Sequence, residues 1–200
     1  MKKVGIMGGT FNPIHNGHLF LAEHAYEQAK LDYVLFMPTM NPPHKADIAI
    51  ESAEHRINMV DLAISDNPHF RLSDFEYQRP GMTYTSDTLE LLKELEPDTE
   101  YYYIVGGDSL MMMDHWMNPQ MVFDLATIVT GSRKQGEAND LKIQAQHLER
   151  KYNGKVILLD MPIMEMSSEN IRERILNRKF IKYYVPEKVM SYIYDNKLYN

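Results

Sequence analysis

The feature that most constrains the fold is a repeated change of hydrophobic period along the chain. Short apolar runs, each the length of one buried strand, alternate with longer stretches in which apolar residues recur every three or four positions. This alternation is typical of α/β proteins, in which helices connect parallel strands by right-handed crossovers. We therefore predict a doubly wound, mostly parallel five-stranded sheet, with strands at residues 3–7, 33–38, 101–105, 125–130 and 155–159.

Helix signals fill most of the segments between these strands. Helices are expected at residues 17–30, 52–66, 85–95 and 139–152, with shorter ones at 109–116 and after Asn118. Thr85 or Ser86 is the expected N-cap of the third helix, and residues 70–78 are expected to be an extended edge element. Two final helices, at 169–178 and from Pro186, predict a small C-terminal helical part. Without repeats or a linker, we expect a single domain, residues 1–200.

Composition narrows the class of function. The chain has 200 residues, 44% of them hydrophobic, no cysteine, no targeting signal and no apolar run of membrane-spanning length, so we expect a cytoplasmic enzyme without disulfides. A formal net charge of -7 argues against nucleic acid and anionic membranes as partners. A polyanionic substrate must then be bound by local cations, for which Lys45, Arg133 and Arg172 are the candidates beside the histidines.

The junction at residues 8–18 lies between the first predicted strand and its helix. Gly8 and Gly9 allow backbone amides to approach a ligand, and Thr10 adds a hydroxyl donor. The helix start adds the positive end of its dipole, so the junction favours an anion, and we expect a phosphate. Neither G-x-x-x-x-G-K-[ST] nor G-x-G-x-x-G is present, which disfavours P-loop hydrolysis and nicotinamide-dependent hydride transfer.

Two histidines, His15 and His18, flank the start of that helix. Both imidazoles could donate hydrogen bonds to one phosphoryl group, and stabilising charge on phosphoryl oxygens is most of what nucleotidyl transfer needs from a protein. The alternative is a solvent-facing loop with two incidental histidines. The run of suitable residues at a strand-to-helix junction favours the functional interpretation.

Three other segments place polar groups where they could reach the same ligand. His44 and Lys45 follow the second strand, and Asp108 follows the third after Gly106. Near the C-terminus, a helix start capped by serine, with Arg172 in its first turn, predicts a second anion site. The alternative for Arg172 is an ordinary solvated helix face.

These motifs together resemble a known family. The string Gly8-Gly9-Thr10-Phe11-x-Pro13-x-His15-x-Gly17-His18 is similar to the signature of the H-x-G-H nucleotidyltransferases, which have a Rossmann-like fold. Two further motifs resemble those of the bacterial nicotinate (nicotinamide) mononucleotide adenylyltransferases. One is Pro42-Pro43-His44-Lys45, and the other is Ser167-Ser168-Glu169-Asn170-Ile171-Arg172, which is similar to that family's I-S-S-T-x-I-R element. Between these motifs, the chain matches the family's order at Tyr84-Thr85-x-Asp87-Thr88, Gly106-x-Asp108 and Trp116. The resemblance therefore covers nearly the whole chain.

The resemblance implies transfer of AMP from ATP to nicotinate mononucleotide by direct in-line attack, with Mg²⁺ accompanying ATP and pyrophosphate released. It implies that His15, His18 and Arg172 are catalytic, and that Asp108 contacts the ribose. No side chain is assigned as a metal ligand. The implied ATP-binding residues are Gly8, Gly9, Thr10, Phe11, His15, His18, Gly106, Asp108, Ser167, Ser168, Ile171 and Arg172.

The acceptor side is expected in the middle of the chain. Trp116 is the sole tryptophan and could stack on a pyridine ring, although core packing is the alternative. The resemblance places main-chain groups near Thr85 and Met117 against the nicotinate carboxylate. The implied acceptor-binding residues are His44, Lys45, Thr85, Trp116, Met117 and Arg133.

Two departures from the family pattern affect the detailed contacts. Glu169 stands where the pattern has threonine, and its carboxylate could pair with Arg172. Lys134 stands where the pattern has proline. The role of His115 is left open, as is the choice between nicotinate and nicotinamide mononucleotide. A homodimer is worth testing, given the resemblance and a chain with 13 Tyr and 15 Met residues.

Two other functions remain as alternatives. A related nucleotidyltransferase could use another phosphorylated acceptor, such as phosphopantetheine, because the H-x-G-H core concerns the nucleotide. A sensor module could bind ATP without turning it over. Class I aminoacyl-tRNA synthetases share the H-x-G-H signature, but 200 residues and an acidic net charge leave little room for an anticodon-binding domain.

Overall fold

A parallel sheet forms the centre of the protein in the computed structural model, which describes residues 1–40, 50–77, 81, 83–132 and 136–200. Among these residues the sheet has six strands in the order β3-β2-β1-β4-β5-β6, and every pairing is parallel. The strands are β1 (Lys2–Gly9), β2 (Tyr33–Pro38), β3 (Phe70–Leu72), β4 (Thr99–Gly106), β5 (Ala126–Gly131) and β6 (Val156–Leu159). The predicted doubly wound α/β class is confirmed.

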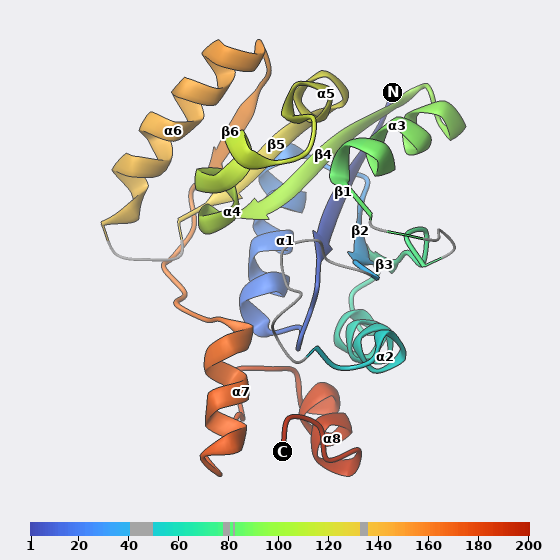
Figure 1. The fold of residues 1–200 in the computed structure, drawn as a ribbon, viewed down its shortest axis with the longest axis vertical. Coiled ribbons are helices and arrows are strands. Elements are labelled where there is room, and N and C mark those ends of the chain that lie inside the picture. Colours follow the sequence, from blue (N-terminus) through green and yellow to red (C-terminus); the bar gives the residue numbers. More distant parts are fainter. Residues whose placement is uncertain (41–49, 78–80, 82, 133–135) are drawn as a thin grey trace.

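Helices connect the strands and extend the chain beyond them. They are α1 (Asn16–Ala29), α2 (Ala53–Ile64), α3 (Thr85–Leu95), α4 (Gly107–Met112), the 3₁₀ helix η1 (Met113–His115), α5 (Pro119–Leu125), α6 (Glu137–Tyr152), α7 (Ser168–Leu176) and α8 (Glu187–Asp195). Figure 1 shows α7 and α8 beyond the carboxyl end of β1, apart from the helices that cover the sheet. These two helices form the predicted C-terminal helical part.

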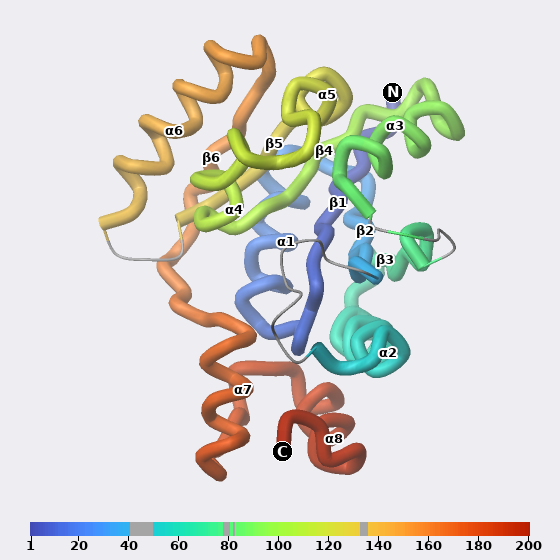
Figure 2. Tube along the Cα trace, in the orientation of Figure 1, coloured from blue at the N-terminus to red at the C-terminus, as the bar shows by residue number. Residues whose placement is uncertain are grey.

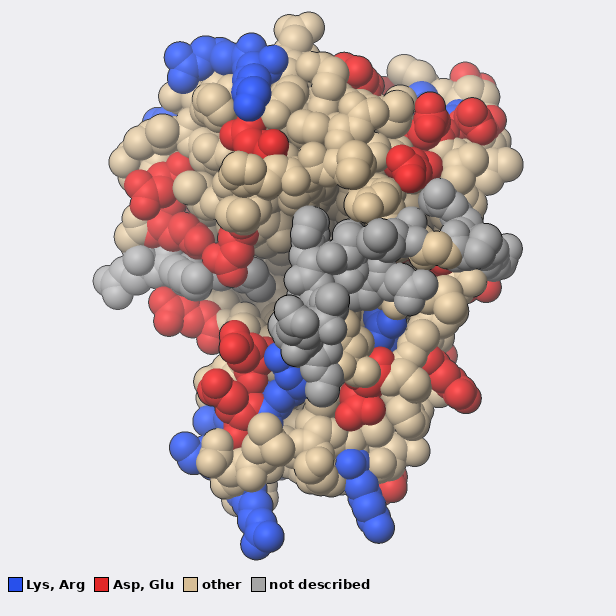
Figure 3. Space-filling model, in the orientation of Figure 1, with Lys and Arg blue, Asp and Glu red and all other residues tan. Residues whose placement is uncertain are grey.

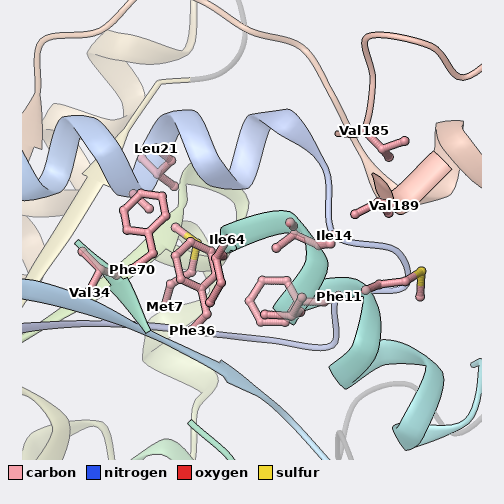
Figure 4. Packing of buried hydrophobic residues seen from close by; sticks show 14 of the residues in the cluster. Met7, Phe11, Ile14, Leu21, Val34, Phe36, Ile64, Phe70, Val185 and Val189 are labelled. Atoms are coloured by element: carbon pink, nitrogen blue, oxygen red, sulfur yellow. The ribbon is translucent and has the colours of Figure 1, made fainter. Parts of the chain in front are cut away.

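Strand alternation divides the core into two layers. Tyr102 and Ile104 belong to the cluster that includes apolar residues of α1, α2, α7 and α8, whereas Tyr101 and Tyr103 belong to the cluster that includes residues of α3 to α6. Successive side chains of a strand point to opposite faces, so a continuous apolar run such as residues 101–105 can serve both layers. Figure 4 shows part of the first layer, in which Met7 and Phe36 lie near Phe70 and Ile64.

The predicted number of strands was wrong by one, because β3 is a sixth strand. Phe70 pairs with Val34 and Leu72 with Phe36, which places β3 at the edge of the sheet next to β2. The extended segment was expected to run over residues 70–78, but the strand ends at Leu72. The charged residues Asp74 and Glu76 obscured this short edge strand in the sequence pattern.

Most element boundaries differ from the predictions by one or two residues, and three of the differences bear on the site. Gly8 and Gly9 belong to β1, because their pairing with β2 continues to Pro38. α6 starts at Glu137 instead of Asn139, since acidic residues in the first turn favour the helix N-terminus. The N-cap of α3 is Tyr84, in extended conformation, instead of Thr85 or Ser86.

Candidate active site

The site lies where the strand order reverses. β1 and β4 are neighbours, but their following helices pack in opposite layers, and a crevice at the carboxyl ends of such a strand pair is where open α/β sheets bind ligands. The β1 end delivers Gly8 and Gly9, and the β4 end delivers Gly106 and Asp108. The topology therefore brings the two predicted glycine junctions to one edge of the sheet (Figure 1).

The loop between β1 and α1, residues 10–15, is anchored in the core by two of its own side chains. Phe11 and Ile14 are fully buried, and the ring of Phe11 lies 6.1 Å from that of Phe36. In Figure 4 both side chains point into the apolar layer between the sheet and the helices. The peptide bond between Asn12 and Pro13 is cis. We call this segment the phosphate loop, after its predicted ligand.

The two histidines of the motif stack on one another at the start of α1. Their ring centroids lie 3.7 Å apart with planes inclined by 24°, and the ring of Phe11 meets His18 edge-on at 5.1 Å. The backbone N–H of His15 donates to Nδ1 of His18 over 3.2 Å. Because Nδ1 accepts this bond, a neutral His18 ring carries its proton on Nε2 and donates from there. The arrangement holds two imidazoles side by side at a helix N-terminus.

The start of α7 packs against the phosphate loop across more than 150 residues of sequence. Ser167 is the N-cap and accepts a hydrogen bond from the Asn170 N–H. The Ser168 hydroxyl donates to the Pro13 carbonyl over 2.8 Å. Arg172 donates from Nη1 to the Asn12 carbonyl over 2.8 Å, while Ile171 is buried beneath them. The two predicted anion-binding helix starts therefore lie together.

On the α3 side, the predicted acceptor residues meet around Tyr103. The Tyr103 hydroxyl lies 3.3 Å from Oγ1 of Thr85, and its ring meets Trp116 edge-on at 6.0 Å. A Cβ on Gly8 would lie 2.3 Å from the same hydroxyl, so only glycine fits there. Burial raises the pKa of Tyr103 to about 12, which keeps the phenol neutral. Tyr103 therefore connects the β1 junction to the acceptor side.

The β4 junction is shaped by α6. Gly106 is the N-cap of α4, and Asp108 lies exposed in its first turn. A Cβ on Gly107 would come within 2.9 Å of the Glu137 carboxylate, which also accepts from the Ser132 hydroxyl over 3.4 Å. A second carboxylate therefore lies near Asp108, which the sequence patterns did not indicate.

The remaining predicted residues fall into two groups. His44, Lys45, Arg133 and Lys134 lie outside the described residues. Met117, like His115, is exposed beside Trp116. The histidines without a motif contact other residues: His24 bonds the Phe20 carbonyl, His55 bonds Tyr192, His69 stacks on Tyr26 and His147 pairs with Asp114.

Sequence reasoning missed three residues around this site. Tyr103 was expected only as part of the strand at residues 101–105, and nothing in the sequence distinguishes it from the neighbouring tyrosines. Arg56 is 2% exposed and Tyr199 is 9% exposed, and both contact the phosphate loop. An arginine in a helical pattern and a tyrosine after the last helix carry no local signal of such contacts.

The surface of the protein carries charged side chains of both signs. On the face shown in Figure 3, Lys and Arg side chains form one group near the upper end of α6 and another around α7 and α8, where Asp and Glu side chains lie beside them. In the described ranges, no three His, Asp or Glu side chains form a group that could hold a metal ion. Within the same ranges, no helix has the length and apolar character needed to span a bilayer.

Comparisons with known proteins agree with this geometry. The cytidylyltransferase-like family model matches residues 6–174. Proteins named probable nicotinate-nucleotide adenylyltransferase are 47% identical in Lachnoclostridium phytofermentans and 43% identical in Clostridium novyi, and both alignments cover 100% of each chain. A Plasmodium falciparum nicotinic acid mononucleotide adenylyltransferase complexed with NaAD has a TM-score of 0.82 at 22% identity, covering 100% of this chain and 98% of that one. The structural likeness shows the shared fold.

Proposed function

The chain belongs to the cytidylyltransferase-like family and, within it, to the nicotinate-nucleotide adenylyltransferases, and from this premise we propose that it transfers AMP from ATP to nicotinate mononucleotide. The product is nicotinate adenine dinucleotide, and pyrophosphate is released. The observation that carries this proposal is the meeting of the stacked histidines with the start of α7 at the end of β1. The relatives' names favour nicotinate over nicotinamide mononucleotide as the acceptor.

The proposed reaction is an in-line displacement at the α-phosphorus of ATP. A phosphate oxygen of the acceptor forms the new bond, and the bond from the α-phosphorus to its bridging oxygen breaks, so that pyrophosphate leaves. Negative charge increases on the phosphoryl oxygens during this step, and fixed donors stabilise it best in a site whose geometry is already set. The proposed donors are His15, His18 through Nε2, and Arg172.

The remaining triphosphate contacts would come from the two helix starts. The hydroxyl of Thr10 and the amides at Gly8 and Gly9 would bind the triphosphate, and Ser168 would contribute its backbone N–H at the N-terminus of α7. Asp108 would accept from the ribose hydroxyls. The nearby Glu137 carboxylate could share that task, because ribose offers two hydroxyl donors.

Mg²⁺ is proposed to enter with ATP. This ion keeps several waters and is held largely by phosphate oxygens, so a site of this kind needs few protein ligands. The donor set fits that arrangement, because the imidazoles of His15 and His18 and the remaining N–H groups of the Arg172 guanidinium could donate to the phosphates, while the ion itself would be held by phosphate oxygens and water. When bound, the ion would neutralise charge on the departing pyrophosphate.

The acceptor would bind on the α3 side. Trp116 would stack on the pyridine ring, and main-chain groups near Thr85 and Met117 would meet the nicotinate carboxylate. His44, Lys45 and Arg133 remain proposals for the acceptor and its phosphate. We further propose a cytoplasmic location, in keeping with the lack of cysteine, and self-association as a homodimer.

An acceptor panel tests this function. The purified protein is incubated with ATP, Mg²⁺ and one of nicotinate mononucleotide, nicotinamide mononucleotide or phosphopantetheine, while pyrophosphate is measured. The proposal expects the highest kcat/KM with nicotinate mononucleotide. Pyrophosphate release with phosphopantetheine alone would overturn the assignment of nicotinate mononucleotide as the acceptor. ATP binding without pyrophosphate release for any acceptor would favour a sensor module.

A further inference from the structure

A buried hydrogen-bond network holds the phosphate loop from the side of the core. The side chain of Asn12 is 3% exposed, and its Oδ1 accepts from the Tyr199 hydroxyl over 3.0 Å and from the Glu51 N–H over 3.2 Å. The Tyr199 N–H in turn donates to Oε1 of Glu51 over 3.0 Å. Tyr199 follows α8, and Figure 2 shows this end of the chain beside α7 and α8, on the side of the β1 carboxyl end.

Arg56 of α2 forms the second part of this network. Its guanidinium donates to four main-chain carbonyls over 2.7 to 3.1 Å, those of Glu51, Thr10, Thr39 and Met40. Burial lowers the pKa of Arg56 from its ordinary value, yet the fan of carbonyl partners compensates the buried charge. One side chain thus ties the phosphate loop to the end of β2 and to the segment before α2.

The direction of these bonds matters for an anion site. The carbonyls of Thr10, Asn12 and Pro13 all accept from side chains outside the loop, namely Arg56, Arg172 and Ser168. A carbonyl oxygen repels phosphate, whereas an N–H group attracts it. In a trans peptide the C=O and N–H point in opposite directions, so binding the Thr10 carbonyl to Arg56 turns the Phe11 N–H away from Arg56.

We propose that Tyr199 and Arg56 are positioning residues for the phosphate loop, which binds ATP. In this proposal, Tyr199 and Arg56 do not contact the phosphates. They fix residues 10–12, so that the donors of the phosphate loop and the stacked histidines keep the positions that the triphosphate needs. Misplacing a binding loop by a fraction of an ångström weakens each hydrogen bond that it makes in the transition state. The inference rests on the proposed function, because it assigns the loop to ATP.

The chain offers a matched control on α8. Tyr192 also joins the C-terminal part to α2: its hydroxyl shares a hydrogen bond with Nδ1 of His55 over 2.9 Å and accepts one from Nδ2 of Asn58 over 3.0 Å. Among the described residues, no side-chain hydrogen bond joins His55 or Asn58 to residues 10–12. Tyr192→Phe and Tyr199→Phe each remove one hydroxyl from the same region, and they differ in whether that hydroxyl bonds the phosphate loop.

The test compares Tyr199→Phe, Tyr192→Phe and Arg56→Lys by melting temperature, by ATP affinity from calorimetry, and by kcat and KM for both substrates. Tyr199→Phe is expected to lower ATP affinity and kcat/KM for ATP about tenfold, with KM for the acceptor nearly unchanged. Arg56→Lys keeps the charge without the fan of donors, so it should show the same pattern. Tyr192→Phe should lower only the melting temperature.

A double-mutant cycle separates positioning from general stability. If Tyr199 acts through Asn12, Tyr199→Phe should have little further effect on ATP affinity in an Asn12→Ala background. Equal effects of Tyr199→Phe and Tyr192→Phe on ATP affinity, or additive effects with Asn12→Ala, would overturn the inference. Calorimetry with ATP needs no acceptor, so this test gives a result even if the acceptor assignment fails.

Discussion

The imidazole rings of His15 and His18 stack face to face, with centroids 3.7 Å apart, at the first turn of α1. Phe11 fixes one edge of this pair, and the His15 N–H fixes the Nδ1 side of His18. The His18 ring is therefore held before any ligand binds, and the His15 ring stacks on it. A pre-set pair of donors at a helix N-terminus costs little reorganisation when phosphoryl charge increases, which is the condition for effective electrostatic stabilisation.

His18→Ala should lower kcat by about a hundredfold or more, because one donor to the phosphoryl oxygens is removed. Steady-state pyrophosphate release measures the change. His24→Ala is the control, since His24 lies on the same helix, where its Nδ1 bonds the Phe20 carbonyl and its ring packs on that of Phe20. A folded His18→Ala protein with unchanged kcat would remove His18 from the mechanism.

Arg172→Ala should reduce kcat/KM for ATP by about tenfold to a hundredfold, because a charge-assisted donor and the hydrogen bond to the Asn12 carbonyl are lost together. Arg174→Ala serves as the control on the same helix, where Arg174 donates to the Phe180 carbonyl and lies over the Tyr184 ring. Equal kinetic losses in both variants would show that Arg172 acts only through the stability of α7.

Tyr103→Phe should raise KM for the acceptor by about threefold to tenfold and leave KM for ATP nearly unchanged. The variant keeps the ring against Trp116 but removes the hydroxyl that bonds Thr85. Tyr102→Phe is the control, because its hydroxyl donates to Glu100 and its ring lies in the other layer. A change in KM for ATP alone would contradict the assignment of Tyr103 to the acceptor side of the site.

The contacts of Asp114 should make the free energy of unfolding depend on pH in the acid range. A hydrogen bond from Lys151, assisted by one from Tyr152, lowers the pKa of the Asp114 carboxyl from 3.8 to about 2. Because the folded pKa is depressed, this contact stabilises fully above about pH 4 and is lost as the pH falls toward 2. The difference in unfolding free energy between wild type and Asp114→Asn should shrink over that range, as measured by urea denaturation. A constant difference would contradict the assignment.

The fold was predictable where burial sets a strong period. β2 and the buried stripe of α6 formed by Leu141, Ala145, Leu148 and Tyr152 were expected from apolar spacing alone, and the structure confirms them. β3 is different, because three residues at a sheet edge are too few to show a period. Its pairing with β2 depends on a long-range register that local sequence does not express.

The site was predictable where one segment carries the chemistry. The glycines and histidines at residues 8–18 indicate an anion site because the spacing itself is informative. Arg56, Tyr103 and Tyr199 act through partners 46, 18 and 187 residues away, respectively, so no local pattern could reveal them. Their identification needed the tertiary structure, and the roles of all site residues stay predictions until measured.

The central claim is that the phosphate loop presents ATP for attack at its α-phosphorus by nicotinate mononucleotide. ATP carrying a radioactive α-phosphate tests this claim most directly, with the products separated after a single turnover. The account predicts that the label appears in nicotinate adenine dinucleotide, that pyrophosphate is unlabelled, and that His18→Ala forms the same products more slowly. Label that stays in ATP, or that is transferred only to phosphopantetheine, would contradict it.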